Sequence, residues 1–568
     1  MDDLKGPKQK TLTLSDWWTA FIAINSTDKR WAGALRAALA ILIPGSIAMV
    51  TGNQDAILLI CAGAFTVIYG EGIVYRKRWK VMLTAGALLW LGVMVGALVG
   101  SLVFAPGHGH AWLLLTAVYV AVLGAGIVFV QNALRLPPPG GFFIVMVTGG
   151  STMLARTGID PLEAGFWPLT AIATGLILGM LPALRDPHGP ERATVATLER
   201  ATKAFQQAKD DEIARHHQAQ TALAAAWEAL ADAGFINAGH NAVSSQHELV
   251  ERTLNAQRAI VQRNQEGTGA DAEAFFESVN LIDPDRTTMP HSRPTARYRI
   301  YRSLTADSHA MITAKKVLIA GLVTGVIGIA LGLNRPDWGV ISALLILQNG
   351  PEKVPGTIRG THRVLGSMLG LVLFSMFYFF GVGGWTMLAA LAICQFFAEI
   401  MVVKNYALCV IFSTPLALMM GGLTEPLSSL VMSRGFEIGL SVVFAFIVLW
   451  FFSNGSKERE NKRLQLRAYQ SMSTVLGSLL TGTPDEALVQ RRDLQYELLS
   501  ERRSIQSLAM DHPAQAQQQW GKHRAIQHAG YQILDYCALS PNTMMDHGAL
   551  GTLIESVRRI APSHDGAK

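Results

Sequence analysis

Apolar runs long enough to cross a membrane recur along the chain, and they constrain its fold more than any other feature. A helix needs about 20 apolar residues to span the ~30 Å hydrocarbon core of a bilayer. Charged residues make up 16% of the 568 residues, whereas a typical soluble domain has about 25%. The sequence therefore predicts an all-α membrane protein that crosses the bilayer many times.

The apolar runs form two groups of six, and a polar block follows each group. In both polar blocks apolar residues recur every three or four positions, which is typical of amphipathic helices. The predicted spans are 31–50, 54–74, 80–104, 111–131, 142–157 and 165–184, then 315–333, 337–349, 363–382, 385–403, 406–421 and 434–453. The predicted units are an N-terminal segment at 1–30, a first transmembrane repeat at 31–184, a helical domain at 185–313, a second transmembrane repeat at 314–453 and a C-terminal helical domain at 454–568.

Basic residues in the short loops predict the orientation of the chain. The loop YRKRWK (75–80) is strongly basic, and Lys and Arg resist transfer across the membrane. The stretch EKVPGTIRGTHR (352–363) in the second group is basic as well. Both stretches, both helical domains and both chain termini are therefore expected on the cytoplasmic side.

The two groups resemble each other in sequence, which indicates an internal repeat. Segments 35–55 and 315–337 align, and this places Arg36 opposite Lys316. Each group then continues with a short apolar run, a basic cluster and a long run punctuated by glycine. Because six spans return the chain to the side where it started, the repeats are expected to be parallel, related by an axis along the membrane normal.

Glycines at four-residue spacing recur in the predicted spans, for example Gly92 and Gly96, and Gly366 and Gly370. A missing side chain lets two helix backbones approach closely. We therefore interpret these glycines as packing positions rather than as parts of a gate.

The eighth run, 337–349, is too short to cross a bilayer as a helix. A Gly- and Pro-rich stretch follows it and contains Arg359 and Arg363, which would share one helix face. Short, interrupted segments at matching places in two repeats are the best sequence indicator of a transport site. A cavity there would favour an anion, because a guanidinium group can hold a carboxylate with two hydrogen bonds.

Ionisable residues at membrane depth are functional candidates, because a buried charge there costs on the order of 3 kcal/mol or more. Residues near span ends can instead extend their charged groups to the lipid headgroups, and we favour this interpretation for Lys353 and Lys404. The predicted substrate-binding residues are Arg36, Arg359, Arg363 and Arg434, and the predicted proton-coupling residues are Glu71, Glu352 and Glu399.

Motifs for catalysis, nucleotide binding and metal binding are absent from the sequence. It has no G-x-x-x-x-G-K-[ST] loop, no H-E-x-x-H and no G-x-S-x-G. The His pairs at 108–110 and 216–217 lie too close together to ligate one metal well, and the four cysteines lack metal-ligand spacing. The net charge of +6 is ascribed to cytoplasmic anchoring. We therefore predict no enzyme, no ATP-driven pump, no cofactor, no metal site and no nucleic-acid partner.

Three segments of the second group resemble the fusaric acid resistance family of bacterial inner-membrane proteins, namely 337–370, 404–420 and 433–442. The family's Arg-x-x-Gly-x-x-x-Gly element, its Asn-Tyr-Ala element and its later Arg match Arg363, Gly366, Gly370, Asn405, Tyr406, Ala407 and Arg434. Ser367 replaces the Thr that is common in the family. In the first group the likeness is weaker, with Lys80 in place of the Arg and Leu83 in place of the first Gly.

This resemblance implies proton-coupled efflux of small aromatic carboxylic acids, such as fusaric or hydroxybenzoic acid, across a bacterial inner membrane. Some family members work with a periplasmic adaptor protein. The plant aluminium-activated malate channels are distantly similar and assemble as dimers. An organic-anion substrate, an adaptor and a homo-oligomer are therefore the expected partners. Two alternatives stay open: a passive organic-anion channel, and a non-transporting membrane scaffold or sensor whose helical domains bind partners.

Overall fold

The structure is a computed structural model that describes residues 30–157, 159, 163–208, 212–236, 247–265, 294–402, 404–420, 426–452, 455–539 and 542–561. Within these ranges the regular elements are helices, and no β-strand is present. The predicted all-α class is therefore confirmed.

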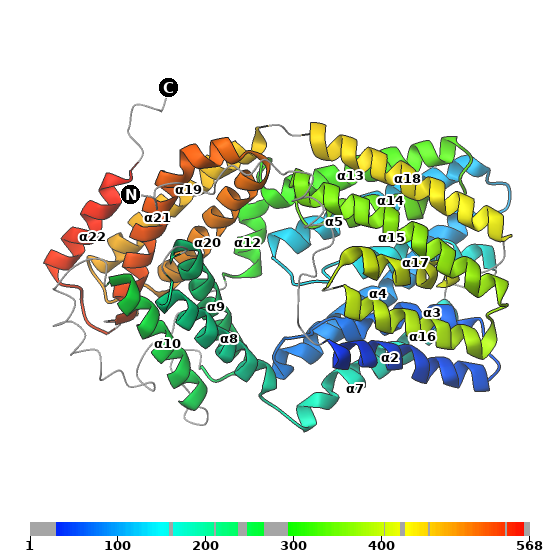
Figure 1. The fold of residues 1–568 in the computed structure, drawn as a ribbon, viewed down its shortest axis with the longest axis horizontal. Coiled ribbons are helices and arrows are strands. Elements are labelled where there is room, and N and C mark those ends of the chain that lie inside the picture. The colour runs from blue at the N-terminus through cyan, green and yellow to red at the C-terminus, as the bar shows by residue number, and fades with distance from the viewer. Residues whose placement is uncertain are drawn as a thin grey trace.

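Twelve apolar helices form one block, at the right of Figure 1. In the described part of the chain, eight of the twelve are long and apolar enough to cross a membrane and four are shorter. The first half contains α2 (Trp31–Val50), α3 (Ala56–Ala64) with the 3-10 helix η2 (Phe65–Ile68), α4 (Tyr75–Val103), α5 (Leu113–Ala133), α6 (Phe142–Ser151) and α7 (Glu163–Met180). The second half contains α13 (His309–Ala330), α14 (Pro336–Leu347), α15 (Lys353–Phe379), α16 (Gly384–Met401), α17 (Tyr406–Met420) and α18 (Leu427–Phe451).

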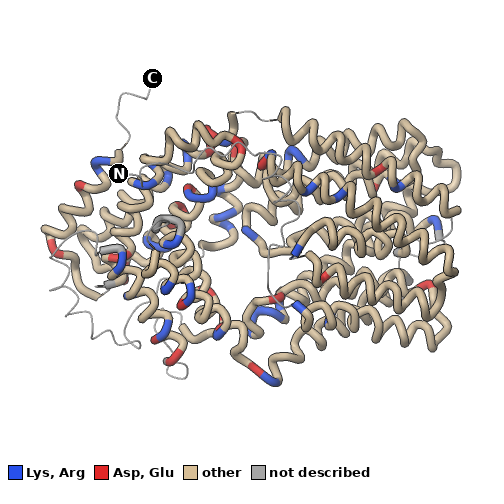
Figure 2. The backbone as a smooth tube through the Cα atoms, viewed as in Figure 1, with Lys and Arg blue, Asp and Glu red and all other residues tan. Residues whose placement is uncertain are grey.

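The outer surface of this block is apolar, as a surface facing lipid must be. One face of α4 exposes Leu88, Leu91, Val95, Leu98 and Leu102 at three- or four-residue spacing. Figure 2 shows few charged residues along the membrane helices and many in the remaining helices. The chain is thus a multi-pass membrane protein.

The two halves of the membrane block use the same helix pairings. In the first half α3 packs on α7, and α4 packs on α6; in the second half α14 packs on α18, and α15 packs on α17. The halves join through two matching contacts, α2 with α16 and α13 with α5. These matching contacts are the ones expected if the two halves have the same helix arrangement.

The glycine ladders lie at these helix contacts, which confirms the packing interpretation. A Cβ atom on Gly366 would lie 2.5 Å from the Ala407 carbonyl oxygen of α17. In the first half, a Cβ on Gly96 would lie 2.4 Å from the Thr148 carbonyl oxygen of α6. Such distances exclude any side chain larger than hydrogen, so glycine is required for the close approach.

Two helices of the second half begin earlier than the sequence predicts. Helix α15 begins at Lys353 rather than at 363, and α18 begins at Leu427 rather than at 434. The Pro in α15 lies in its first turn, where proline is tolerated because the missing N–H has no helical partner. As a result Arg359, Arg363 and Arg434 all project from within helices.

Among the described residues, eight further helices lie outside the membrane block, at the left of Figure 1 and at its boundary. Helices α8 to α10 pack around Trp227, and α19 to α22 pack around Leu494 and Leu498. The backbone N–H of Lys353 donates to the carboxylate of Asp511 at 2.8 Å, which joins the start of α15 to the end of α20. These helices are α8 (Gly189–Gln206), α9 (Glu212–Ala233), α10 (His247–Gln265), α12 (Ala296–Ser303), α19 (Ser456–Leu479), α20 (Leu488–Asp511), α21 (Pro513–Leu539) and α22 (His547–Arg559).

Candidate functional site

A cavity of about 430 Å³ lies inside the membrane block where the two halves meet. All four short membrane helices contribute to its wall: α3 with η2, α6, α14 and α17. The long helices α15, α16 and α18 complete it. Backbone groups that a short helix leaves free at membrane depth must face protein or a polar cavity. We call this space the membrane cavity.

Three arginines give one side of the membrane cavity its positive charge. Arg359 and Arg363 lie one turn apart on α15, and Arg434 lies on α18. Arg359 donates to the Ile346 carbonyl oxygen at 3.3 Å, and Arg363 donates to the Ser342 hydroxyl at 3.4 Å. Both partners are on α14, so this short helix holds the two guanidinium groups in place.

Arg434 and Arg363 each have a hydrogen-bond donor without an acceptor among the described residues. The Arg434 guanidinium lies 3.9 Å from the centre of the Trp338 ring and 3.7 Å from Glu437. Among the described residues, the Nε atoms of Arg363 and Arg434 have no hydrogen-bond partner, although both are buried. Buried donors in native proteins are nearly always satisfied. An anion in the cavity would supply the acceptors that these two groups lack.

One carboxylate, Glu399, belongs to the same wall. It is the only Asp or Glu among the described residues that line the membrane cavity. Its carboxylate lies 3.9 Å from the guanidinium of Arg30, which also lines the cavity. Gln395 lines the cavity one helical turn before it. The site therefore combines one acidic group with several cations.

Aromatic rings form much of the remaining wall. Phe65 and Phe143, from the first half, stack with their ring centres 4.2 Å apart. Phe142, Trp338 and Tyr406 complete the aromatic surface. Flat apolar walls beside guanidinium groups suit a ligand that has both a ring and a carboxylate.

Four of the seven residues predicted for the site line this cavity, namely Arg359, Arg363, Arg434 and Glu399. Arg36 and Glu71 do not: Arg36 donates to both Glu71 oxygens, at 2.8 and 3.0 Å. Arg78 donates to Glu71 as well, at 3.1 Å. Glu352 lies elsewhere, in a second cavity, where it accepts a hydrogen bond from Ser507 at 2.7 Å. A transport role for each of these seven residues stays a prediction.

The predicted alignment of Arg36 with Lys316 has a structural counterpart. Arg36 bonds to a residue 35 positions ahead, Glu71, and Lys316 bonds to the carbonyl oxygen of Pro351, also 35 positions ahead. In both halves, a cation on the first helix therefore forms a hydrogen bond with the chain segment that follows the second, short helix.

Lys80 and Leu83, which the sequence aligns with Arg363 and Gly366, do not line the membrane cavity. Lys80 is exposed, and Leu83 is 48% exposed on the lipid-facing side of α4. By packing, Gly92 corresponds to Gly370: a Cβ on Gly92 would lie 2.3 Å from the Thr148 hydroxyl of α6, and a Cβ on Gly370 would lie 3.1 Å from the Thr414 hydroxyl of α17. Ala85, which is buried, lies seven residues before Gly92, as the buried Arg363 lies seven residues before Gly370.

The aromatic residues of the first half were missed by sequence reasoning. The run 142–157 was predicted as one span, but α6 ends at Ser151. The sequence did contain a signal. The turn residues PPPGG (137–141) come directly before Phe142 and Phe143, and a similar Gly- and Pro-rich stretch adjoins the short eighth run. If the run that begins at Phe142 had been treated like the eighth run, as a short helix beside the cavity, these two rings would have been predicted at the site.

Comparison with known proteins agrees with the sequence resemblance. Residues 319–448 match a family model described as fusaric acid resistance protein-like. The chain is also similar to YvaC, an uncharacterized membrane protein of Bacillus subtilis (strain 168), with 22% identity over 587 residues that cover 90% of this chain and 86% of that protein. No solved structure matches the chain significantly. The chain is thus a membrane protein with a fusaric acid resistance protein-like region at residues 319–448.

Proposed function

We propose that the protein is a secondary transporter that exports small aromatic carboxylic acids and couples their export to protons. The observation that supports this most strongly is the membrane cavity, which four arginines, one glutamate and several aromatic rings of the described residues line. Residues 319–448, which match the family model, include Arg359, Arg363, Arg434 and Glu399.

The cavity suits such a cargo in size and chemistry. Its volume of about 430 Å³ falls within the range of roughly 300–1,000 Å³ that is usual for small-molecule sites. Arg363 and Arg434 have free donors for a carboxylate, and Phe143 and Trp338 offer faces for an aromatic ring. The carboxylate of an aliphatic acid would contact the arginines, but such an acid has no ring to pack against the aromatic residues of the wall.

Glu399 is the proposed proton carrier. It is the acidic group of the cavity wall, and Arg30 lies beside it at 3.9 Å. Intramembrane carboxylates commonly serve as proton relays in transporters. Uptake of a proton by Glu399 in exchange for release of the acid would let an inward proton gradient drive export.

Transport measured with the purified full chain in proteoliposomes tests this proposal. Labelled hydroxybenzoate is presented to the side of the extramembrane helices, with and without an imposed pH gradient. Accumulation above equilibrium that requires the gradient is the expected result. Movement that only reaches equilibrium, with or without the gradient, would replace the exporter with an anion channel. No movement of any acid in a broad panel would contradict both and favour a scaffold or sensor.

A further inference from the structure

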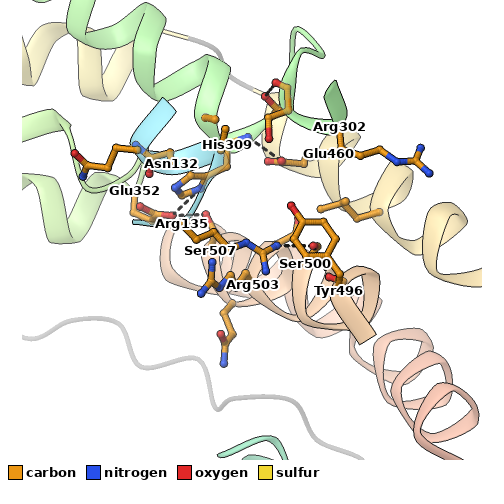
Figure 3. A pocket seen from close by; sticks show the side chains of 18 of the residues that line it. Asn132, Arg135, Arg302, His309, Glu352, Glu460, Tyr496, Ser500, Arg503 and Ser507 are labelled. Carbon is orange, nitrogen blue, oxygen red and sulfur yellow. Dashed lines mark hydrogen bonds and ion pairs between the residues drawn. The ribbon is translucent and has the colours of Figure 1, made fainter. Parts of the chain in front are cut away.

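A second cavity, of about 620 Å³, lies where the membrane block meets α19 and α20 (Figure 3). Its wall combines the end of α5 and residues 135–137 with the start of α13 and the connection between α14 and α15. One face of α19 and one face of α20 close the other side. We call this space the vestibule.

The vestibule adjoins the membrane cavity. Gln131, Leu136 and Asn349 line both spaces. Asn132, which lines the vestibule, donates to the Gln348 carbonyl oxygen at 3.0 Å, and Gln348 lines the membrane cavity. A solute in the vestibule would therefore lie next to the space that contains Arg359 and Arg363.

The vestibule has an excess of positive charge. Its wall includes the guanidinium groups of Arg135, Arg302, Arg463, Arg467 and Arg503 and the carboxylates of Glu352 and Glu460. A third carboxylate, that of the buried Glu497, lies 2.6 Å from Arg467. Five cations therefore face three carboxylates. Burial also raises the pKa of Glu460 to about 7, which weakens its negative charge near neutral pH. A recess with this balance attracts anions.

Neither Arg135 nor Arg503 forms an ion pair with a carboxylate in the part of the chain that the structure describes. Arg135 donates to the Ser500 hydroxyl at 2.5 Å, and its guanidinium lies 4.3 Å from the centre of the Tyr496 ring. Arg503 is exposed, and among the described residues none forms a hydrogen bond or an ion pair with it. Figure 3 shows both arginines beside Ser500 and Ser507.

One face of α20 carries the groups that an aromatic acid needs. Tyr496, Ser500, Arg503, Ser504 and Ser507 recur every three or four positions and all line the vestibule, so they share one side of the helix. A guanidinium group can bind a carboxylate in a bidentate manner. Hydroxyl groups add donors, and the Tyr496 ring adds an apolar face.

We propose that the vestibule is a binding site for the organic-acid anion before it reaches the membrane cavity, with Arg503 and Arg135 contacting the carboxylate and Tyr496 contacting the ring. The identity of the ligand rests on the proposed function. The site itself rests on the charge and on the shared wall of the two cavities. A phosphate group would also be attracted by the arginines, but it would make no use of the aromatic face.

Protection of a cysteine placed in the vestibule tests occupancy without requiring transport. Gln506 is exposed and lines the vestibule, so the variant is Gln506→Cys in a chain that also carries Cys409→Ser. The other three native cysteines are buried. Hydroxybenzoate is expected to slow the reaction of this cysteine with N-ethylmaleimide, whereas inorganic phosphate at equal ionic strength is not. Ser473→Cys, on the exposed side of α19, should react at the same rate throughout.

Arg503→Gln then tests the proposed contact. It is expected to remove the protection and to raise the KM for transport about tenfold, the loss typical of one charge-assisted hydrogen bond. Arg558→Gln removes the same charge from the exposed surface of α22 and should change neither value. Transport without protection at Gln506→Cys, protection that survives Arg503→Gln, or equal protection by phosphate would overturn the inference. Protection without transport would contradict the proposed function while leaving this site in place.

Discussion

The two membrane halves share their helix pairings but contribute different chemistry to the membrane cavity. The second half supplies Arg359, Arg363, Arg434 and Glu399, and Arg30, just before α2, supplies a further cation beside Glu399. The first half supplies aromatic rings, among them Phe65, Phe142 and Phe143. The first half also has buried charges, but Arg36 and Arg78 bind Glu71 away from the cavity.

A single pair of positions shows how such a difference can arise on a shared scaffold. Gly92 and Gly370 each pack against a threonine of the fifth helix of their half, where a side chain would collide. Seven residues earlier stand Ala85 and Arg363, both buried. Helix packing depends on the glycines and leaves the earlier position free to differ. Two halves with one packing scheme can therefore divide the binding of a ring and of a carboxylate between them.

The largest effect is expected when Glu399 is changed to Gln. If this carboxylate carries the proton, gradient-driven accumulation of hydroxybenzoate should be lost completely, while exchange of acid at equilibrium persists. Glu71→Gln makes the same chemical change in the first half, outside the cavity, and should still accumulate the acid. Accumulation by Glu399→Gln at the wild-type level would show that this residue is not the coupling group.

A smaller effect is expected for Arg359→Gln. Losing one guanidinium contact to the carboxylate should raise the KM for hydroxybenzoate about tenfold. Arg36→Gln removes the corresponding kind of charge from the first half and should change the KM less than about twofold, because Arg36 bonds to Glu71 instead of lining the cavity. Equal effects of the two substitutions in initial-rate measurements would remove the distinction between the halves.

The smallest effect is expected for Phe143→Leu, which alters the aromatic surface of the first half. Loss of one ring contact, worth about 0.5–1.5 kcal/mol, should raise the KM for hydroxybenzoate about fivefold. The KM for an aliphatic acid should stay the same. Phe379→Leu, on an exposed position of the second half, is the matched control. A similar change for aliphatic and aromatic acids would indicate a general packing defect rather than ring recognition.

Most of the membrane helices could be predicted because apolar length is a local property of the sequence. Helix α2 begins and ends at Trp31 and Val50, as predicted. The start of α15 was missed because Gly356 and Gly360 look like turn residues. In the structure they instead make room for Leu449 and Phe446 of α18, which a Cβ atom would approach to 2.5 and 2.3 Å. That contact depends on tertiary packing and leaves no local signal.

The candidate site could be predicted in part for the same reason. Arg359 and Arg363 were found because a four-residue spacing places two side chains on one helix face. The contact of Arg434 with Trp338 and the placement of Phe143 depend on helices far apart in the sequence. Arg36 and Glu71 were chosen for their depth in the membrane, and nothing local indicated that they would bind each other.

We expect Arg363 to bind the carboxylate of the cargo, whereas Lys80, which the sequence aligns with it but which lies outside the cavity, should not. Equilibrium binding of hydroxybenzoate to the purified full chain, measured by calorimetry for the wild type, Arg363→Gln and Lys80→Gln, tests this most directly. The account predicts that Arg363→Gln weakens binding at least about tenfold and that Lys80→Gln, which changes an exposed residue, leaves it unaltered. Wild-type affinity in Arg363→Gln, or equal losses in both variants, would contradict it.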